Sequence, residues 1–136
     1  MAVNWKPVSG WTLSPGFSYL QLHLHASPTS TDTTSVAKVE GSSPRQQAQL
    51  RSHVELPRHL AWDTSVYFVG RLAALQIPSY TRLDTSLTWQ ARNGVSFSLV
   101  GQNLLKDHHL EFNGPDQIVV SSLVKRSVYA KIVWHF

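Results

Sequence analysis

Apolar and polar residues alternate with a period of two along most of this chain. In the stretch 46–56 the apolar residues Leu50 and Val54 have even numbers, whereas Arg51 and Glu55 have odd numbers. Successive side chains of a β-strand point to opposite faces, so this alternation predicts a strand with one apolar and one polar face. The same alternation recurs in the segments 60–70, 82–90, 95–102 and 128–136. We find no helical period of useful length.

The segment 11–24 is less regular. Trp11 and Phe17 share one parity, but Leu20 and Leu24 share the other, and Pro15-Gly16 interrupts the run. We therefore predict a strand with a bulge or a phase change between residues 15 and 20. The residues around Trp5 predict a short stub before it. The sequence thus predicts an all-β, antiparallel, up-and-down meander of about six long strands plus an N-terminal stub.

The predicted connections alternate in length. Those at 7–10, 57–59 and 91–94 are short, and the last contains Asn93-Gly94, a strong hairpin signal. Those at 25–44 and 106–122 are long, and the one at 73–79 is intermediate. Short turns at one end of the strands and longer loops at the other are typical of outer-membrane β-barrels.

The tryptophans lie near the short turns and near the end of the last strand, and all of them have the apolar parity. They are Trp5, Trp11, Trp62, Trp89 and Trp134. An indole ring prefers the membrane interface, because it is apolar yet carries an N–H group that needs a partner. The distribution therefore predicts an interface girdle of a membrane barrel. Tyr19, Phe68 and Tyr80 are expected to form a second girdle at the opposite ends.

The charged residues within the predicted strands take the polar parity. They are Arg51, Glu55, Asp63, Arg82, Asp84 and Lys131. A lysine or arginine that faces lipid at the middle of a bilayer costs about 2–4 kcal/mol, so a barrel is expected to turn these residues toward its lumen. There we expect the carboxylates to pair with the basic residues across neighbouring strands. Arg126 has the lipid parity, but it lies near the outer end, where a long side chain reaches the interface.

The composition agrees with this interpretation. Only 15% of the 136 residues are charged, with a formal net charge of +4, against about 25% charged residues in an average soluble domain. The absence of cysteine excludes a disulfide framework and a thiolate metal site. The apolar runs are too short for a membrane-spanning helix, and residues 1–7 do not resemble the start of a signal peptide.

Several short stretches in the second half of the chain resemble one membrane-protein family. They are Pro-Ser-Tyr-Thr-Arg-Leu-Asp at 78–84, Gly-Gln-Asn-Leu-Leu at 101–105, His-Leu-Glu-Phe at 109–112 and the final strand. Their order and spacing resemble the C-terminal β-barrel segment of a TonB-dependent outer-membrane receptor. Pro-Arg-Gln at 44–46, leading into 50–52, resembles an earlier strand of the same barrels, so the resemblance covers nearly the whole chain.

The final strand also resembles the outer-membrane assembly signal, in which apolar or aromatic residues recur two apart before a terminal aromatic residue. The matching residues are Val128, Ala130, Ile132, Trp134 and Phe136. A merely amphipathic last strand is the alternative interpretation.

The resemblance implies that residues 1–136 form an open portion of a transmembrane barrel of about 22 strands, without its plug domain. It implies a location in the cell outer membrane and, in the full-length protein, uptake of a scarce nutrient such as an iron–siderophore complex or cobalamin. The implied partners are outer-membrane lipid, the barrel assembly machinery, the plug domain and TonB. Arg51, Arg82 and Asp84 are expected to face the plug.

Two alternatives stay open. A small independent outer-membrane β-barrel with a structural or adhesion role would need an even number of strands, at least about eight. A soluble β-sandwich binding module would need a second layer over the face that carries the tryptophans.

Candidate chemistry is sparse. No serine nucleophile has an identifiable base beside it, so we expect no enzyme. The aromatic residues face away from the basic ones, so we expect no nucleic-acid partner. His23 and His25, and His108-His109 near Glu111, are candidate metal ligands, but we interpret them as polar strand ends and loop structure, with no cofactor.

Overall fold

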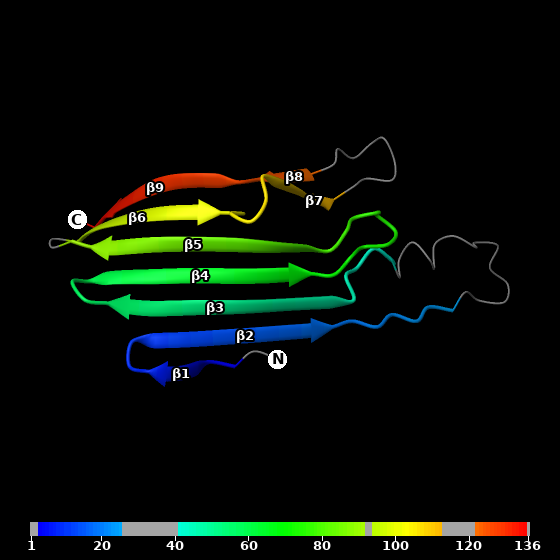
Figure 1. The fold of residues 1–136 in the computed structure, drawn as a ribbon, viewed down its shortest axis with the longest axis horizontal. Coiled ribbons are helices and arrows are strands. Elements are labelled where there is room, and N and C mark those ends of the chain that lie inside the picture. Colours follow the sequence, from blue (N-terminus) through cyan, green and yellow to red (C-terminus); the bar gives the residue numbers. More distant parts are fainter. Residues whose placement is uncertain (1–2, 26–40, 92–93, 113–121, 136) are drawn as a thin grey trace.

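The main body of the fold is a seven-stranded antiparallel β-sheet. The computed structural model describes residues 3–25, 41–91, 94–112 and 122–135. The strands of the sheet are β1 (Trp5–Val8), β2 (Trp11–Tyr19), β3 (Gln46–Leu56), β4 (Leu60–Val69), β5 (Tyr80–Gln90), β6 (Val95–Gln102) and β9 (Ser127–Trp134). They are hydrogen-bonded in the order β1-β2-β3-β4-β5-β6-β9, so β1 and β9 form the two edges (Figure 1). The predicted six long strands and N-terminal stub are therefore confirmed.

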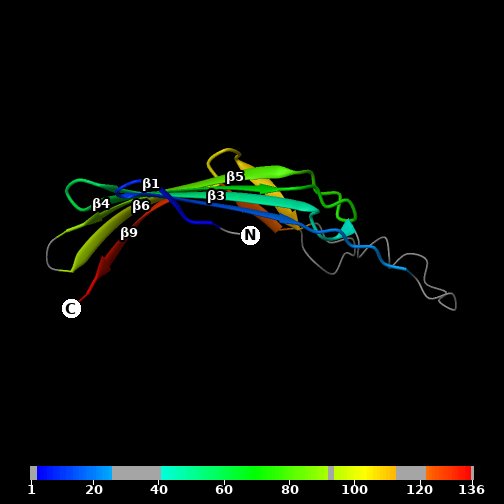
Figure 2. The same cartoon turned by 90° about the horizontal axis from the view of Figure 1, so that it is seen from below.

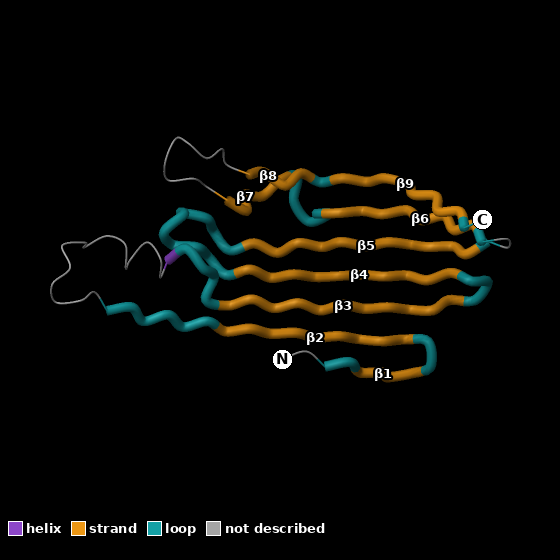
Figure 3. The backbone as a smooth tube through the Cα atoms, turned by 180° about the vertical axis from the view of Figure 1, so that it is seen from behind, coloured by secondary structure: helices purple, strands orange, loops and turns teal. Residues whose placement is uncertain are grey.

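The sheet is one curved layer. Viewed from its side, the strands form a gently bent surface (Figure 2). In the part of the chain that the structure describes, each strand packs against its neighbours in the sheet, and no second layer covers either face. The longer connections leave the sheet at one end and the short turns at the other (Figure 3).

The predicted bulge in the first long strand is wrong. The register between β2 and β3 runs without a shift from Trp11 opposite Val54 to Tyr19 opposite Gln46. The change of parity marks the end of the strand, because Leu20 and the residues after it lie outside β2. The one irregularity of register on this side of the sheet lies in β1, between Trp5 and Val8.

Pro15 fits inside β2 because of the direction of its backbone groups. Its carbonyl oxygen accepts a hydrogen bond from the Val3 N–H, at 3.3 Å, on the β1 side. The N–H and C=O groups of one strand residue point to the same side, so the N–H that proline lacks would also have pointed toward β1. The ladder between β2 and β3 therefore loses no hydrogen bond at this position.

The predicted long loop 106–122 is partly wrong. It contains β7 (His108–Phe112) and the first residue of β8 (Ser122–Lys125), which pair as a separate two-stranded hairpin between β6 and β9. These strands are shorter than the six long strands of the sheet, so their alternation was too brief to identify. The long loop 25–44 falls mostly outside the described residues.

The predicted alternation continues across the whole sheet. In an antiparallel pair, residues directly opposite each other lie on the same face. The row Pro15–Leu50–Val66–Leu83 joins four strands on one face, and the row Gly16–Gln49–Tyr67–Arg82 joins the same strands on the other. We call these the apolar face and the polar face.

The chain buries little apolar surface. Its accessible surface is 10356 Å², whereas a compact monomer of 15.3 kDa exposes about 7,100 Å². Among the described residues, the buried apolar side chains are Leu72 and Ile77, which form a small bridge in the connection between β4 and β5. The strands themselves therefore have no conventional core.

Candidate functional site

The apolar face of the sheet is its most unusual surface. Large apolar side chains stand exposed on every strand of the sheet, including Leu50 at 44% and Ile132 at 67% exposed. Isolated exposed apolar residues are normal on soluble proteins, but a continuous apolar patch that extends over all seven strands of a sheet marks an interaction surface.

The tryptophans form a line across this face near the short turns. Trp11 and Trp62 lie in one row, because both are paired with Val54. Trp5 lies opposite Leu13, so it is two residues further from the turns. The line therefore crosses the strands at an angle.

Between β4 and β9 the tryptophans lie progressively nearer to the short turns. Trp89 is paired with Leu60, two residues nearer to the turns than Trp62. Trp134 is paired with Val95 and is displaced by two residues more. From Trp5 to Trp134 the line advances along the strands by about one residue for each strand crossed. One residue advances about 3.4 Å along a strand, and neighbouring strands are about 4.7–4.9 Å apart. The line is therefore inclined by roughly 35° from the perpendicular to the strands.

Two of the indole N–H groups are satisfied by hydroxyl groups on the apolar face. Trp11 Nε1 donates to Ser52 Oγ at 3.0 Å, and Trp62 Nε1 donates to Thr85 Oγ1 at 2.8 Å. Thr85 in turn donates to the Asp63 carbonyl oxygen at 3.0 Å and lies 3.2 Å from the Thr64 hydroxyl. These polar atoms therefore pair among themselves on an otherwise apolar surface.

The predicted second girdle is partly wrong. Tyr19 and Phe68 lie on the apolar face near the ends opposite the tryptophans. Tyr80 is paired with Val69, which faces Gln47, so it lies on the polar face. The prediction considered only its distance from the turns and overlooked its parity.

The six predicted charged residues all lie on the polar face, but their pairing differs from the prediction. Arg82 and Asp84 form an ion pair within β5, with Nη2 to Oδ2 at 2.7 Å and Nε to Oδ1 at 2.9 Å. This pair lies along one strand, two residues apart, and does not cross between strands. Among the described residues, Arg51 and Lys131 have no ion-pair partner.

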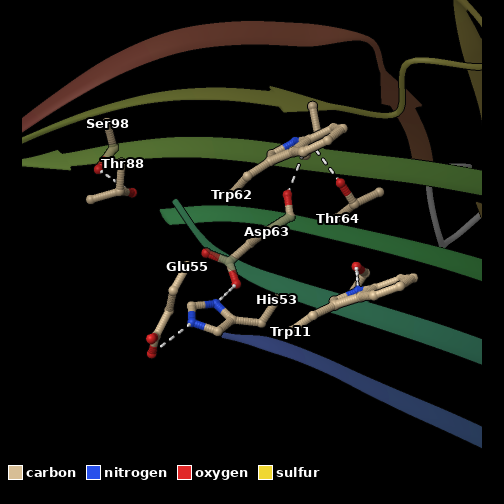
Figure 4. Close-up of polar contacts among 10 residues, drawn as sticks. Trp11, His53, Glu55, Trp62, Asp63, Thr64, Thr88 and Ser98 are labelled. Atoms are coloured by element: carbon tan, nitrogen blue, oxygen red, sulfur yellow. Dashed lines mark hydrogen bonds and ion pairs between the residues drawn. The ribbon is translucent and has the colours of Figure 1, made fainter. Parts of the chain in front are cut away.

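His53 is the partner that sequence reasoning missed. Its Nδ1 lies 2.7 Å from Asp63 Oδ1, and its Nε2 lies 4.0 Å from Glu55 Oε1 (Figure 4). The predicted pairing of these two carboxylates with Arg51 or Lys131 is therefore wrong. The signal was present, since two strands separated by a tight turn place His53 opposite Asp63.

Asp84 and Asn103, which belong to two of the sequence motifs quoted above, meet in one partly buried cluster. Asp84 Oδ1 also accepts the backbone N–H of Asn103 at 2.9 Å, and the Asn103 side chain donates to the Val124 carbonyl oxygen at 2.9 Å. Asn103 is fully buried and has a φ of +53°, a left-handed conformation that asparagine tolerates better than most residues. The cluster joins β5, the end of β6 and β8.

The final strand lies at the sheet edge beside β6. Val128, Ala130, Ile132 and Trp134 are on the apolar face, opposite Gly101, Leu99, Phe97 and Val95. Phe136 falls outside the described residues. Arg126 precedes the strand and has no lipid-facing position within it. Instead its Nη2 lies 2.6 Å from Asp107 Oδ1.

The described residues contain no group of three or more histidine, aspartate or glutamate side chains that could hold a metal ion. His23 Nε2 lies 2.6 Å from the side-chain amide of Gln21. In the described part of the chain, no helix has the length and apolar character needed to cross a membrane.

Comparisons with protein-family models, with curated proteins and with solved structures return no match for this chain.

Proposed function

We propose that this chain is the C-terminal barrel wall of a TonB-dependent outer-membrane receptor, which in its full-length form takes up a scarce nutrient. The observation that carries the proposal is the uncovered apolar face, bounded at one end by an inclined line of tryptophans. The sequence motifs described above supply the family, and the geometry of the sheet supports a membrane wall.

The inclination of the tryptophan line supports the proposal. Strands in outer-membrane barrels are tilted by about 35–45° from the barrel axis. A line at constant depth in the bilayer must then cross the strands obliquely, and the roughly 35° obtained from the strand register matches that tilt. A girdle perpendicular to the strands would not fit a tilted barrel.

The height of the apolar face, measured between its two aromatic ends, also supports the proposed membrane wall. Trp11 and Tyr19 mark the two ends of β2, which are about 26 Å apart along the strand. With a 35° tilt this separation projects to about 22 Å along the barrel axis, close to the apolar band of about 25 Å in such barrels.

The strand directions favour a segment of a larger barrel over an independent one. Both edge strands, β1 and β9, run toward the short-turn end, so they are parallel to each other (Figure 1). An up-and-down barrel closes through antiparallel neighbours, so an odd number of further strands must lie between these two edges. We propose that the rest of the receptor barrel supplies them.

The soluble sandwich is less well supported. A sandwich hides its apolar faces against each other, about 10 Å apart. In the described residues the face that carries Trp62 and Leu50 has no such covering layer. Transport itself belongs to the complete receptor, since an open sheet with unpaired edges does not span a lipid bilayer.

Complementation tests the proposal. A TonB-dependent receptor is truncated before its last seven strands, fused to residues 5–136 of this chain, and expressed in a strain that needs that receptor for iron uptake. We expect the fusion to assemble in the outer membrane and restore growth on limiting iron. Fusion to a version of this chain in which Leu50 and Leu83 are both arginine is the matched control.

If the control fusion restores growth as well as the unaltered fusion does, the apolar face does not have the proposed membrane role. Failure of the unaltered fusion to reach the outer membrane, although the host receptor's own last seven strands do, would contradict the family assignment.

A further inference from the structure

The end of the sheet opposite the tryptophans contains a pocket with two arginines. Its volume is about 420 Å³, and it lies between the residues that precede β3 and those that follow β4. Arg45, Arg71, Ser43, Gly41 and Gly70 contribute to its lining. None of the described lining residues has a carboxylate.

The two guanidinium groups are not neutralised by any of the described residues. In the part of the chain that the structure describes, neither Arg45 nor Arg71 has an ion pair or a side-chain hydrogen bond. Two like charges beside one pocket repel each other unless an anion lies between them. An anionic group in the pocket would be attracted by both positive charges.

The pocket is held in place by local structure. Gly70 N–H donates to the Gln46 carbonyl oxygen at 2.8 Å, which brings the residues before β3 beside those after β4. Ala74 N–H donates to the Gly41 carbonyl oxygen at 3.0 Å, and a Cβ atom on Gly41 would lie only 2.8 Å from the Ala74 Cβ. A larger residue at position 41 would therefore push the two walls apart.

The wall that presents Arg71 also has its own small core. Leu72 and Ile77 exchange two backbone hydrogen bonds, at 3.0 and 3.1 Å, and Ile77 is only 2% exposed. Arg71 directly precedes this bridge, so its backbone is fixed before any ligand binds. A fixed backbone lowers the entropy lost when the guanidinium binds an anion.

We infer that this pocket binds a phosphate group. A phosphate dianion matches the charge of two guanidinium groups, whereas a carboxylate neutralises only one, and arginine binds phosphate oxygens through paired N–H donors. The pocket begins at the row of Tyr19, Gln46 and Gly70 and extends beyond the ends of these strands. If the proposed function holds, that is the headgroup level of the membrane, so a phosphorylated lipid headgroup is one source and a free phosphate is the other.

The first experiment uses the chain refolded in a non-ionic detergent and titrated with inorganic phosphate at constant ionic strength. The amide resonances of Gly41 and Gly70 report on the pocket, and that of Gly101 reports on the distant sheet. We expect saturable shifts at the first two only. Arg45→Gln and Arg71→Gln should each weaken binding about tenfold or more, since each removes a charge-assisted hydrogen bond.

Arg58→Gln is the matched control, because it removes the same charge in the short turn between β3 and β4, at the other end of the sheet. It should leave the phosphate affinity unchanged. If a glutamine variant misfolds, judged by its circular dichroism and Gly101 resonance, Arg71→Lys replaces it and should still weaken binding. Resonance shifts that do not saturate, or that chloride also produces, would overturn the inference. Equal weakening by Arg45→Gln, Arg71→Gln and Arg58→Gln would overturn it as well.

The second experiment identifies the source of the phosphate. The chain is added to phosphatidylcholine vesicles with and without phosphatidic acid. Shifts at Gly41 and Gly70 that need phosphatidic acid and are lost in Arg71→Gln would assign a lipid headgroup. Binding of free phosphate without any effect of phosphatidic acid would assign a soluble ligand, and it would leave the site intact even if the membrane proposal failed.

Discussion

At the scale of single residues, Asp84 has the largest structural role of the charged residues on the polar face. It accepts hydrogen bonds from Arg82 and from the backbone N–H of the buried Asn103. Asp84→Ala would leave a buried donor without an acceptor, so we expect the free energy of unfolding to fall by about 1–3 kcal/mol. Urea unfolding of the chain in non-ionic detergent micelles measures this loss.

Asp63→Ala is the control for this substitution. Asp63 pairs with His53, but both side chains are nearly half exposed, and exposed ion pairs contribute only about 0–1 kcal/mol. If both variants lose the same stability, the buried cluster around Asn103 does not have the structural role described for it.

Trp62 provides a second prediction at this scale. Trp62→Phe keeps an aromatic ring on the apolar face but removes the indole N–H that donates to Thr85. We expect a loss of about 0.5–1.5 kcal/mol, the usual net value of one hydrogen bond. A double-mutant cycle with Thr85→Val should recover most of that loss as coupling energy.

Trp89→Phe serves as the comparison, because the Trp89 ring stacks on Phe97 with centroids 5.8 Å apart. Its coupling to Thr85→Val should be close to zero. Equal coupling of Trp62 and Trp89 to Thr85 would contradict the specific role of the indole hydrogen bond.

At the scale of elements, the strands and the faces of their residues were predictable, because a period of two continues through each long strand. The end of β2 was not predictable, because the apolar residues from Leu20 onward keep a strand-like spacing although they lie beyond that end. This spacing suggested a bulge near Pro15. The hairpin of β7 and β8 was missed because its strands are too short to establish a period. Contacts such as the ion pair between Arg82 and Asp84 depend on side-chain conformation, which alternation does not specify.

The apolar face gives a prediction that separates lipid from water. Leu50 lies in the middle of β3 on the apolar face, and Gln49 lies beside it on the polar face. If the apolar face contacts lipid, Leu50→Arg should destabilise the receptor fusion in vesicles by about 2–4 kcal/mol, whereas Gln49→Arg should have little effect. Urea unfolding of the fusion reconstituted in vesicles compares the two variants, and similar small effects of both would contradict the lipid contact.

At the scale of the whole molecule, the two unpaired edges are expected to dominate how this chain behaves alone. The His135 N–H donates to the Gly94 carbonyl oxygen. Because the pairing of antiparallel strands alternates, the backbone groups of Ala130 and Ile132 then point away from β6, toward the open edge. Pairing of two β9 edges about a twofold axis would be antiparallel and would keep both apolar faces on one side.

Proline substitutions test this association through the edge. Ala130→Pro removes an N–H that points outward, so it should reduce self-association in micelles while leaving the free energy of unfolding within about 1 kcal/mol of the original. Tyr129→Pro removes an N–H that points toward β6, where Tyr129 faces Val100, so it should destabilise the chain by about 3 kcal/mol. Sedimentation measures association and urea unfolding measures stability. Association that Ala130→Pro leaves unchanged would exclude the β9 edge as the contact, and the β1 edge would then be the next surface to block.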